Sequence, residues 1–395
     1  MFQRRPTGLQ AFAGNAGEPI ARLNSFEGFG RSLIVGIIPL LALESLGSKE
    51  LVTRAYLLAS LLTLLVTLNF ATLERLLRRR WVVTLGASFS VAAALILIFG
   101  QGFSVAVAIG LQSAAASLFS VCISLYIMDY IGKKQLIFTE SKRLLYTGFA
   151  WMIGPTLGLW LWDNWYQWSP FVLAASTAVA MISYFWYLRL GDNAVIRPAK
   201  QTPSNVFKII PRFFSQSALR IAYWVTLSRA IFWMTLFIYG PIYVVEAGLP
   251  TWVAGGLLSI VSALLLASPM IRRLASRHGT RPILIMALTL ASAAIFALYL
   301  IGEPTAAGLW CWILASLGGI TVDVLGNIPF MRLVKPHERT EMTMIFSTWR
   351  EGSQLLTPLV ITLVLLIAPF EVFYLILSAM LATAAFAATY LPRRI

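Results

Sequence analysis

The sequence is poor in charged residues, which make up only 12% of its 395 positions. A soluble domain carries roughly 25%. Hydrophobic residues account for 58% of the chain, which is enough for about twelve membrane helices of roughly 20 apolar residues each. These proportions exclude a water-soluble globule. We expect an all-α membrane protein with many spans.

Cysteine and histidine are also scarce, with two of each. Cys122 and Cys311 lie inside apolar runs, so neither a disulfide framework nor a cysteine-ligated metal site is expected. His278 and His337 fall between the expected spans, which argues against an imidazole metal site. The chain contains no G-x-x-x-x-G-K-[ST], H-E-x-x-H or G-x-S-x-G pattern. We therefore predict no metal, no cofactor and no enzyme activity.

The net charge of +15 is distributed unevenly along the chain. If the N-terminus is cytoplasmic, nearly all basic residues fall in cytoplasmic segments, and the outward loops hold only Lys49. This positive-inside pattern predicts a multi-pass protein with both termini in the cytoplasm, which we place in a bacterial inner membrane. It explains the basic charge without a nucleic-acid partner. The expected spans are 23–46, 51–73, 81–100, 104–130, 136–162, 170–189, 220–246, 251–271, 282–301, 305–330, 341–367 and 371–391.

A polar, proline-containing segment divides these spans into two groups of six. We expect a cytoplasmic tail at 1–22, a six-helix bundle at 23–190, a cytoplasmic linker at 191–219, a second bundle at 220–391 and a short tail at 392–395. Within the linker, the apolar and basic residues around 206–214 fit either an interfacial helix or a plain connection.

The two halves share residues at a nearly constant spacing. Pro39 and Arg75 recur in the second half as Pro241 and Arg277. Such a shift indicates a duplicated unit. Two parallel six-helix repeats that bind a small molecule near the membrane midplane are typical of transporters.

One segment of the second half, Leu274–Pro282, resembles the cytoplasmic loop motif of the major facilitator superfamily. A degenerate first copy occupies 74–79, although Leu77 and Ser276 stand where that motif has its glycine and its acid. The resemblance implies two pseudo-symmetric six-helix bundles and a cytoplasmic gate closed by salt bridges. The implied gate residues are Glu74, Arg75, Arg78, Arg79, Asp129, Arg277, Gly279 and Arg281. Gly154, Pro155 and Gly158 are similar to the family's antiporter-associated motif.

Charged residues inside the expected spans are the first candidates for function, because each is costly in a bilayer. Glu27 and Arg31 lie one helical turn apart in the first span and form either a self-neutralising pair or part of a gate. The repeat places Arg229 at the position of Glu27, so Glu27 and Arg229 are expected to attract each other. Trp233 follows Arg229 by one turn.

Further candidates lie in spans four, ten and eleven. Asp323 has no obvious cation near it in sequence, shares a helix face with Asn327, and is a candidate proton carrier. Serines at helical spacing form a stripe that either packs against another helix or lines a polar path. A second polar stripe indicates a solvated interior face. These stripes include Ser117 and Ser120 in span four, and Arg350, Glu351 and Gln354 in span eleven.

We therefore predict a monomeric secondary transporter that moves a small organic solute or amphiphile by alternating access, with protons as the coupling ion and export by antiport. Uptake or exchange of an organic anion is the alternative, since Arg31, Arg229 and Arg350 can bind carboxylate or phosphate. A transport-inactive sensor or scaffold and an intramembrane lipid enzyme are less favoured. The bilayer itself is the only other expected partner.

Overall fold

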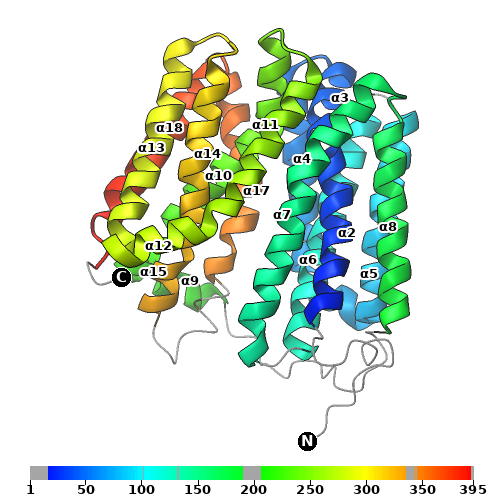
Figure 1. The fold of residues 1–395 in the computed structure, drawn as a ribbon, viewed down its shortest axis with the longest axis horizontal. Coiled ribbons are helices and arrows are strands. Elements are labelled where there is room, and N and C mark those ends of the chain that lie inside the picture. The colour runs from blue at the N-terminus through cyan, green and yellow to red at the C-terminus, as the bar shows by residue number, and fades with distance from the viewer. Residues whose placement is uncertain are drawn as a thin grey trace, which may run out of the picture. The chain divides into compact units, whose positions relative to one another are not determined.

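The computed structural model describes residues 17–100, 102–130, 133–189, 206–334, 342 and 345–392. All described secondary structure is helical (Figure 1). Ten helical segments of this part are long and apolar enough to cross a membrane. Two more helices, α7 and α17, coincide with the other two expected spans. The predicted all-α membrane fold is therefore confirmed.

The chain divides into two compact units. The first comprises Met1–Ala199 with Ala254–Ser259, and the second comprises Lys200–Val253 with Ile260–Ile395. The boundary between Ala199 and Lys200 falls inside the expected linker.

In the first unit, α2 packs along α7 and α8, and α5 packs along α6 and α8. Helix α2 begins at Gly17, inside the stretch expected as a tail, where Glu18 and Arg22 form an ion pair one turn apart at 2.7 Å. The first-unit helices are α2 (Gly17–Val35), α3 (Ile37–Leu46), α4 (Lys49–Leu68), α5 (Phe70–Phe99), α6 (Phe103–Tyr130), α7 (Lys133–Asn164) and α8 (Ser169–Leu188).

In the second unit, α10 contacts α14, α15, α17 and α18, whereas α13 lies between α14 and α18. The short segment Ala254–Ser259 of α11 groups with the first unit. The remaining elements are α9 (Val206–Ser215), α10 (Ser217–Glu246), α11 (Thr251–Ala263), η2 (Leu264–Ala267), α12 (Ser268–His278), α13 (Thr280–Ile301), α14 (Gly308–Leu325), α15 (Asn327–Leu333), α17 (Trp349–Leu365) and α18 (Glu371–Ala388).

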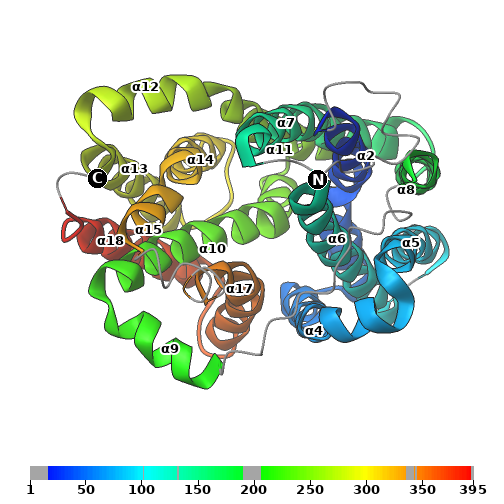
Figure 2. The ribbon, with the colours of Figure 1, turned by 90° about the horizontal axis from the view of Figure 1, so that it is seen from below.

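Helix α9 occupies part of the expected linker and lies beside α10 (Figure 2). Its Phe213 is fully buried in an apolar cluster with Leu219, Phe330 and Phe346. The rings of Phe330 and Phe346 stack with their centroids 4.0 Å apart. The segment is thus helical and is anchored to its own unit by an aromatic side chain, while its position at the membrane interface stays a prediction.

Two of the expected spans are broken by the same local sequence, a glycine followed three residues later by a proline. Gly36 separates α2 from α3, and Gly326 separates α14 from α15. Pro39 and Pro329 have no backbone N–H to donate to the carbonyl four residues earlier, which weakens the helix at that point. The second break lies directly beside Asp323, so it shapes the candidate site.

The first copy of the loop motif differs from its expected form. Residues 74–80 are not a loop, because α5 runs from Phe70 to Phe99 with Arg78 as its one non-helical residue (φ 59°, ψ 146°). In the second copy, Gly279 (φ 88°, ψ 152°) separates α12 from α13. The motif assigns glycine to the position of Leu77. The turn in the first copy therefore falls one residue later, at Arg78.

Candidate functional site

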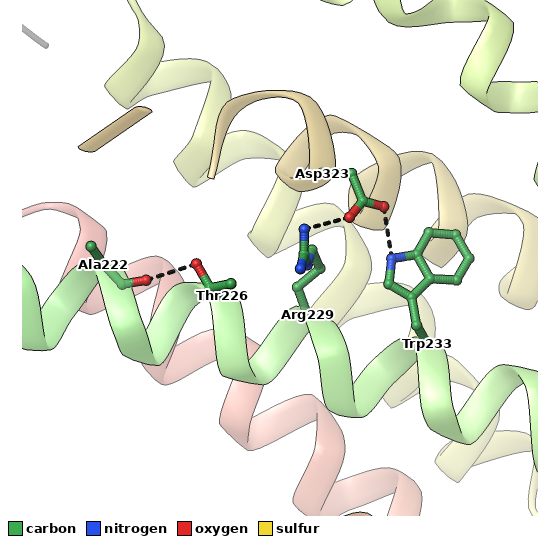
Figure 3. A network of polar contacts seen from close by, with 5 residues as sticks. All are labelled: Ala222, Thr226, Arg229, Trp233 and Asp323. Atoms are coloured by element: carbon green, nitrogen blue, oxygen red, sulfur yellow. Dashed lines mark hydrogen bonds and ion pairs between the residues drawn. The ribbon is translucent and has the colours of Figure 1, made fainter. Parts of the chain in front are cut away.

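A charged centre lies inside the second unit, where α10 faces α14 (Figure 3). Arg229, in the middle of α10, is only 6% exposed, and its Nη1 donates to Oδ1 of Asp323. Trp233, one turn further along α10, donates from Nε1 to Oδ2 of the same carboxylate at 2.8 Å. Both oxygens of Asp323 therefore accept hydrogen bonds from one face of one helix.

An aromatic ring completes the surroundings of the Arg229 guanidinium. Cζ of Arg229 lies 4.7 Å from the ring centroid of Trp349, which begins α17. Cζ of Arg350 lies 5.6 Å from the same centroid. A cation over an indole face is attracted by the ring quadrupole. Trp349 therefore brings two cations close together, although like charges repel.

The two partners of the ion pair differ in access. The side chain of Asp323 is 27% exposed, against 7% for Arg229. Three buried polar atoms, on Arg229 itself and on residues close to the pair in sequence, have no hydrogen-bond partner within the described residues: Arg229 Nε, Ser228 Oγ and Asn327 Oδ1. Buried polar groups are normally paired. The centre thus combines an accessible carboxylate with a guanidinium Nε that makes no hydrogen bond within the described residues.

Asp323, which has no obvious cation near it in sequence, pairs with Arg229 across two helices. Glu27, the expected partner of Arg229, pairs with Arg31 on its own helix, with Nε and Oε1 3.3 Å apart. The Arg31 guanidinium also lies 5.3 Å from the ring centroid of Trp151. Within its own unit, Glu27 contacts Arg31, and Arg229 contacts Asp323. An attraction between Glu27 and Arg229, and a gate role of Glu27 and Arg31, stay predictions.

The other predicted pathway residues lie on several different helices. Ser117 Oγ and Thr67 Oγ1 are 2.7 Å apart and join α6 to α4, which is a packing contact. Ser120 lies half-buried on α6. Asn327 begins α15 directly after the helix break, while Glu351 and Gln354 are half-buried on α17. Their role as a transport path stays a prediction.

The first copy of the gate motif contains a buried ion pair. Arg79 Nε donates to Glu74 Oε1 at 2.8 Å, and the guanidinium lies over Tyr126 at 5.3 Å. Arg78 is exposed at the turn. Arg75 and Asp129 lie in α5 and α6, but their side chains fall outside the described part.

The second copy uses a different acceptor. Ser276 replaces the motif's acid, and Arg281 Nη2 instead donates to the backbone oxygen of Thr389, just past the end of α18. Carbonyl groups at a helix C-terminus lack intrahelical partners and attract cations. Arg277 is exposed on α12, and Gly279 supplies the turn.

The glycines of the antiporter-like motif bring α7 against α2. A Cβ on Gly158 would lie 1.8 Å from the backbone oxygen of Leu33, and one on Gly154 would lie 2.7 Å from Cβ of Ser32. Ser32 Oγ also donates to the oxygen of Ala150 at 3.0 Å. Pro155 sits inside α7 between the two glycines. Within the first unit this motif therefore sets a close helix contact.

Trp349 is the main site residue that the sequence reasoning missed. It directly precedes the predicted polar stripe of α17, and an aromatic residue next to an arginine was the available signal. Ser228 was missed as well, because a serine beside Arg229 on an apolar helix resembles an ordinary packing residue.

Comparison with known proteins decides the family. The model of the Major Facilitator Superfamily matches residues 23–358. The chain belongs to this superfamily. It is therefore a multi-pass membrane transporter of some solute, and the superfamily's small-molecule substrates agree with the predicted class of partner. A comparison with curated proteins finds no match.

Solved structures of the superfamily share the fold at low sequence identity. A mutant of the nucleoside transporter NupG is similar with a TM-score of 0.74 and 13% identity, over 95% of this chain and 99% of that chain. A D-xylose–proton symporter is similar with a TM-score of 0.72 and 12% identity, over 95% and 98%. A bacterial homologue of the iron transporter ferroportin has a TM-score of 0.70 and 15% identity, over 94% and 97%. At these identities the likeness concerns the fold alone.

Proposed function

We propose that the protein is a proton-coupled antiporter that exports an organic solute or amphiphile across a bacterial inner membrane, with both termini in the cytoplasm. The observation that carries this proposal is the carboxylate of Asp323, which is paired with Arg229 and Trp233 but remains the more accessible member of the pair. A monomer suffices, because the centre is built within one unit of one chain.

The proposed coupling is a competition for one carboxylate. A proton on Asp323 removes the charge that holds Arg229, while the guanidinium keeps its contact with Trp349. A cationic or hydrogen-donating solute binds the same carboxylate only after the proton has left. Because proton and solute exclude each other, each binds while the site is open to a different side of the membrane. That sequence of events is antiport by alternating access.

One observation favours a second candidate, the transport of an organic anion. Arg229 and Arg350 both lie near the ring of Trp349, where a carboxylate or phosphate can meet two cations and an aromatic face. Such a solute competes with Asp323 for Arg229. Protonation of Asp323 then assists solute binding, so proton and anion travel together.

Proton flux in reconstituted vesicles tests both candidates. Vesicles containing the protein and an internal pH dye are screened with amphiphilic cations, nucleosides, sugars and organic carboxylates. Antiport predicts that solute added outside releases protons from the lumen, whereas anion symport predicts lumenal acidification. Asp323→Asn should abolish both fluxes while solute exchange persists, because the amide mimics the protonated acid. Glu351→Gln is the matched control and should retain proton flux.

Other outcomes contradict the proposal. If the Asp323→Asn protein still concentrates solute under a pH gradient, the proton carrier is Glu351 or Glu27. A protein that moves no solute of any class is a sensor or scaffold. A product that forms in detergent, without vesicles, identifies a lipid enzyme.

A further inference from the structure

A surface groove runs between α13 and α18 in the second unit. It has a volume of about 260 Å³, and its lining includes Ile285, Thr289, Ala382, Phe386 and Thr389. Both helices are candidate membrane spans. Phe386 is 65% exposed, so the groove opens outward beside a large apolar side chain.

The groove is closed at one end by a contact between two serines. Ser292 Oγ donates to the oxygen of Ser378, and Ser378 Oγ donates to the oxygen of Ser292, each at 2.9 Å. At the other end Thr389 meets Arg281, which lies one turn before Ile285 on α13. The eleven residue steps from Arg281 to Ser292 span about 16 Å of helix. That length matches about half of a bilayer core of about 30 Å, which is the depth of one leaflet.

Polar groups occur along the groove in positions suited to a lipid head group. The hydroxyl of Thr289 makes no hydrogen bond within the described part of the chain. A hydroxyl without a partner in an apolar medium is costly. Within the described residues, Arg281 makes one side-chain hydrogen bond, which uses one of its five guanidinium N–H donors. An ester oxygen and a phosphate provide acceptors for these groups.

The two segments that contain the groove helices are basic in sequence. Neither 247–302 nor 372–395 contains an aspartate or glutamate, and Ser276 stands where the motif has its acid. The arginines of the first segment are Arg272, Arg273, Arg277 and Arg281.

We propose that this groove binds an anionic phospholipid, with one acyl chain lying between α13 and α18 and the phosphate at Arg281. Basic pockets between membrane helices are suited to anionic head groups. The groove and its Arg281 end together have about the depth of one leaflet, and the basic end supplies the charge selection. The site is separate from the Arg229 centre and does not depend on the solute that is transported.

Native mass spectrometry of the delipidated full-length protein tests the site. The protein is titrated with phosphatidylglycerol and with phosphatidylcholine of the same acyl chains. We expect tighter binding of phosphatidylglycerol. Arg281→Gln should lower its affinity about fivefold and leave phosphatidylcholine unchanged, since one arginine at an anionic lipid surface has an effect of this size. Ala382→Phe, which fills the groove, should weaken both lipids.

Matched variants separate this site from general effects. Arg54→Gln removes an exposed arginine of α4, and Met286→Phe enlarges an exposed residue of α13 that does not line the groove. Both should bind phosphatidylglycerol like the unaltered protein. Because Arg281 also contacts the end of α18, Thr289→Leu provides a second variant that leaves this contact intact, and it should weaken phosphatidylglycerol binding.

Cross-linking from a photoreactive acyl chain locates the bound lipid. We expect cross-linked peptides from α13 and α18 that contain Ile285 or Phe386. The proposal is overturned if the unaltered protein binds phosphatidylglycerol no more tightly than the Arg281→Gln, Thr289→Leu and Ala382→Phe proteins do. Cross-links confined to other helices also overturn it. If glycerol phosphate without acyl chains binds as tightly as the lipid, the site recognises a phosphate only and the lipid assignment is wrong.

Discussion

At the scale of single residues, the Arg229–Asp323 pair should dominate the energetics of the second unit. Removing one partner of a buried ion pair leaves an uncompensated charge and costs about 3–5 kcal/mol of unfolding free energy. We expect losses of this order for Arg229→Gln and Asp323→Asn, and partial recovery in the double variant. A double-mutant cycle of unfolding free energies in detergent measures this coupling.

The Glu27–Arg31 pair is the matched comparison for that cycle. It joins residues one turn apart on a single helix, and the Arg31 side chain is 38% exposed. Coupling of exposed pairs at this spacing is about 0.3–0.5 kcal/mol. If the two cycles give equal coupling, the Arg229–Asp323 contact does not exist in the native protein.

Arg78 provides a second prediction at this scale. Its φ of 59° and ψ of 146° fall in a region that is nearly restricted to glycine and costs other residues about 1–3 kcal/mol. Arg78→Gly should therefore raise the unfolding free energy. Leu77→Gly places glycine in a helical position and should lower it by about 1 kcal/mol. Chemical denaturation measures the unfolding free energy of each variant. If Leu77→Gly is the more stable variant, the turn lies at Leu77.

The sequence predicted the important side chains better than their partners. Glu27, Arg229 and Asp323 were all recognised from charge within apolar helices. The structure pairs Arg229 with Asp323 on another helix, a contact that no spacing in the sequence indicated. Spacing along one helix is visible in a sequence, but the rotation of one helix against another depends on packing across the whole bundle.

At the scale of helices, Gly158 should be one of the least replaceable residues. Gly158→Ala would place Cβ 1.8 Å from the oxygen of Leu33, so α7 must move away from α2. We expect a loss of at least about 2 kcal/mol, as for severe overpacking. At Gly148 on the same helix, an added Cβ would have no neighbouring atom within 4 Å. Gly148→Ala should be neutral or stabilising by up to about 1 kcal/mol.

Thermal unfolding followed by size-exclusion chromatography distinguishes these two variants. Equal melting temperatures for Gly158→Ala and Gly148→Ala would contradict the close approach of α7 and α2.

Hydropathy predicted the positions of the spans but not their interruptions. The breaks at Gly36 and Gly326 lie inside two segments, Glu18–Leu46 and Gly308–Phe330, that are on average apolar enough to cross a membrane. The sequence feature that marks each break is a glycine with a proline three residues later. The proline weakens the helix because it cannot donate a backbone hydrogen bond, and this effect does not depend on polarity. A search for helix-breaking residues within apolar segments would have located both breaks.

At the scale of the whole molecule, the two copies of the gate motif should contribute unequally to transport. Arg79 is buried against Glu74 and Tyr126, whereas Arg277 is exposed on α12. We expect Arg79→Gln to lower the turnover number about tenfold, because losing a buried charged hydrogen bond costs about 1.5–3 kcal/mol. Arg277→Gln should change it less than twofold.

The Michaelis constant should stay within about twofold in both variants, since neither residue belongs to the Arg229 centre. Vesicle transport of a solute identified in the dye screen measures both constants. Equal turnover in the two variants would show that the copies act alike, and a selective rise in the Michaelis constant would place Arg79 in the binding site.

The one-residue difference between the two motif turns has a geometric consequence. Arg79 follows its turn residue Arg78 directly, whereas Arg281 comes two residues after Gly279. One residue of an α-helix corresponds to a rotation of about 100°. The two arginines therefore leave their helices in different directions, one back toward Glu74 on its own chain segment and the other sideways to the oxygen of Thr389. A one-residue difference between the copies thus separates an arginine that contacts an acid, Glu74, from an arginine that contacts a backbone carbonyl.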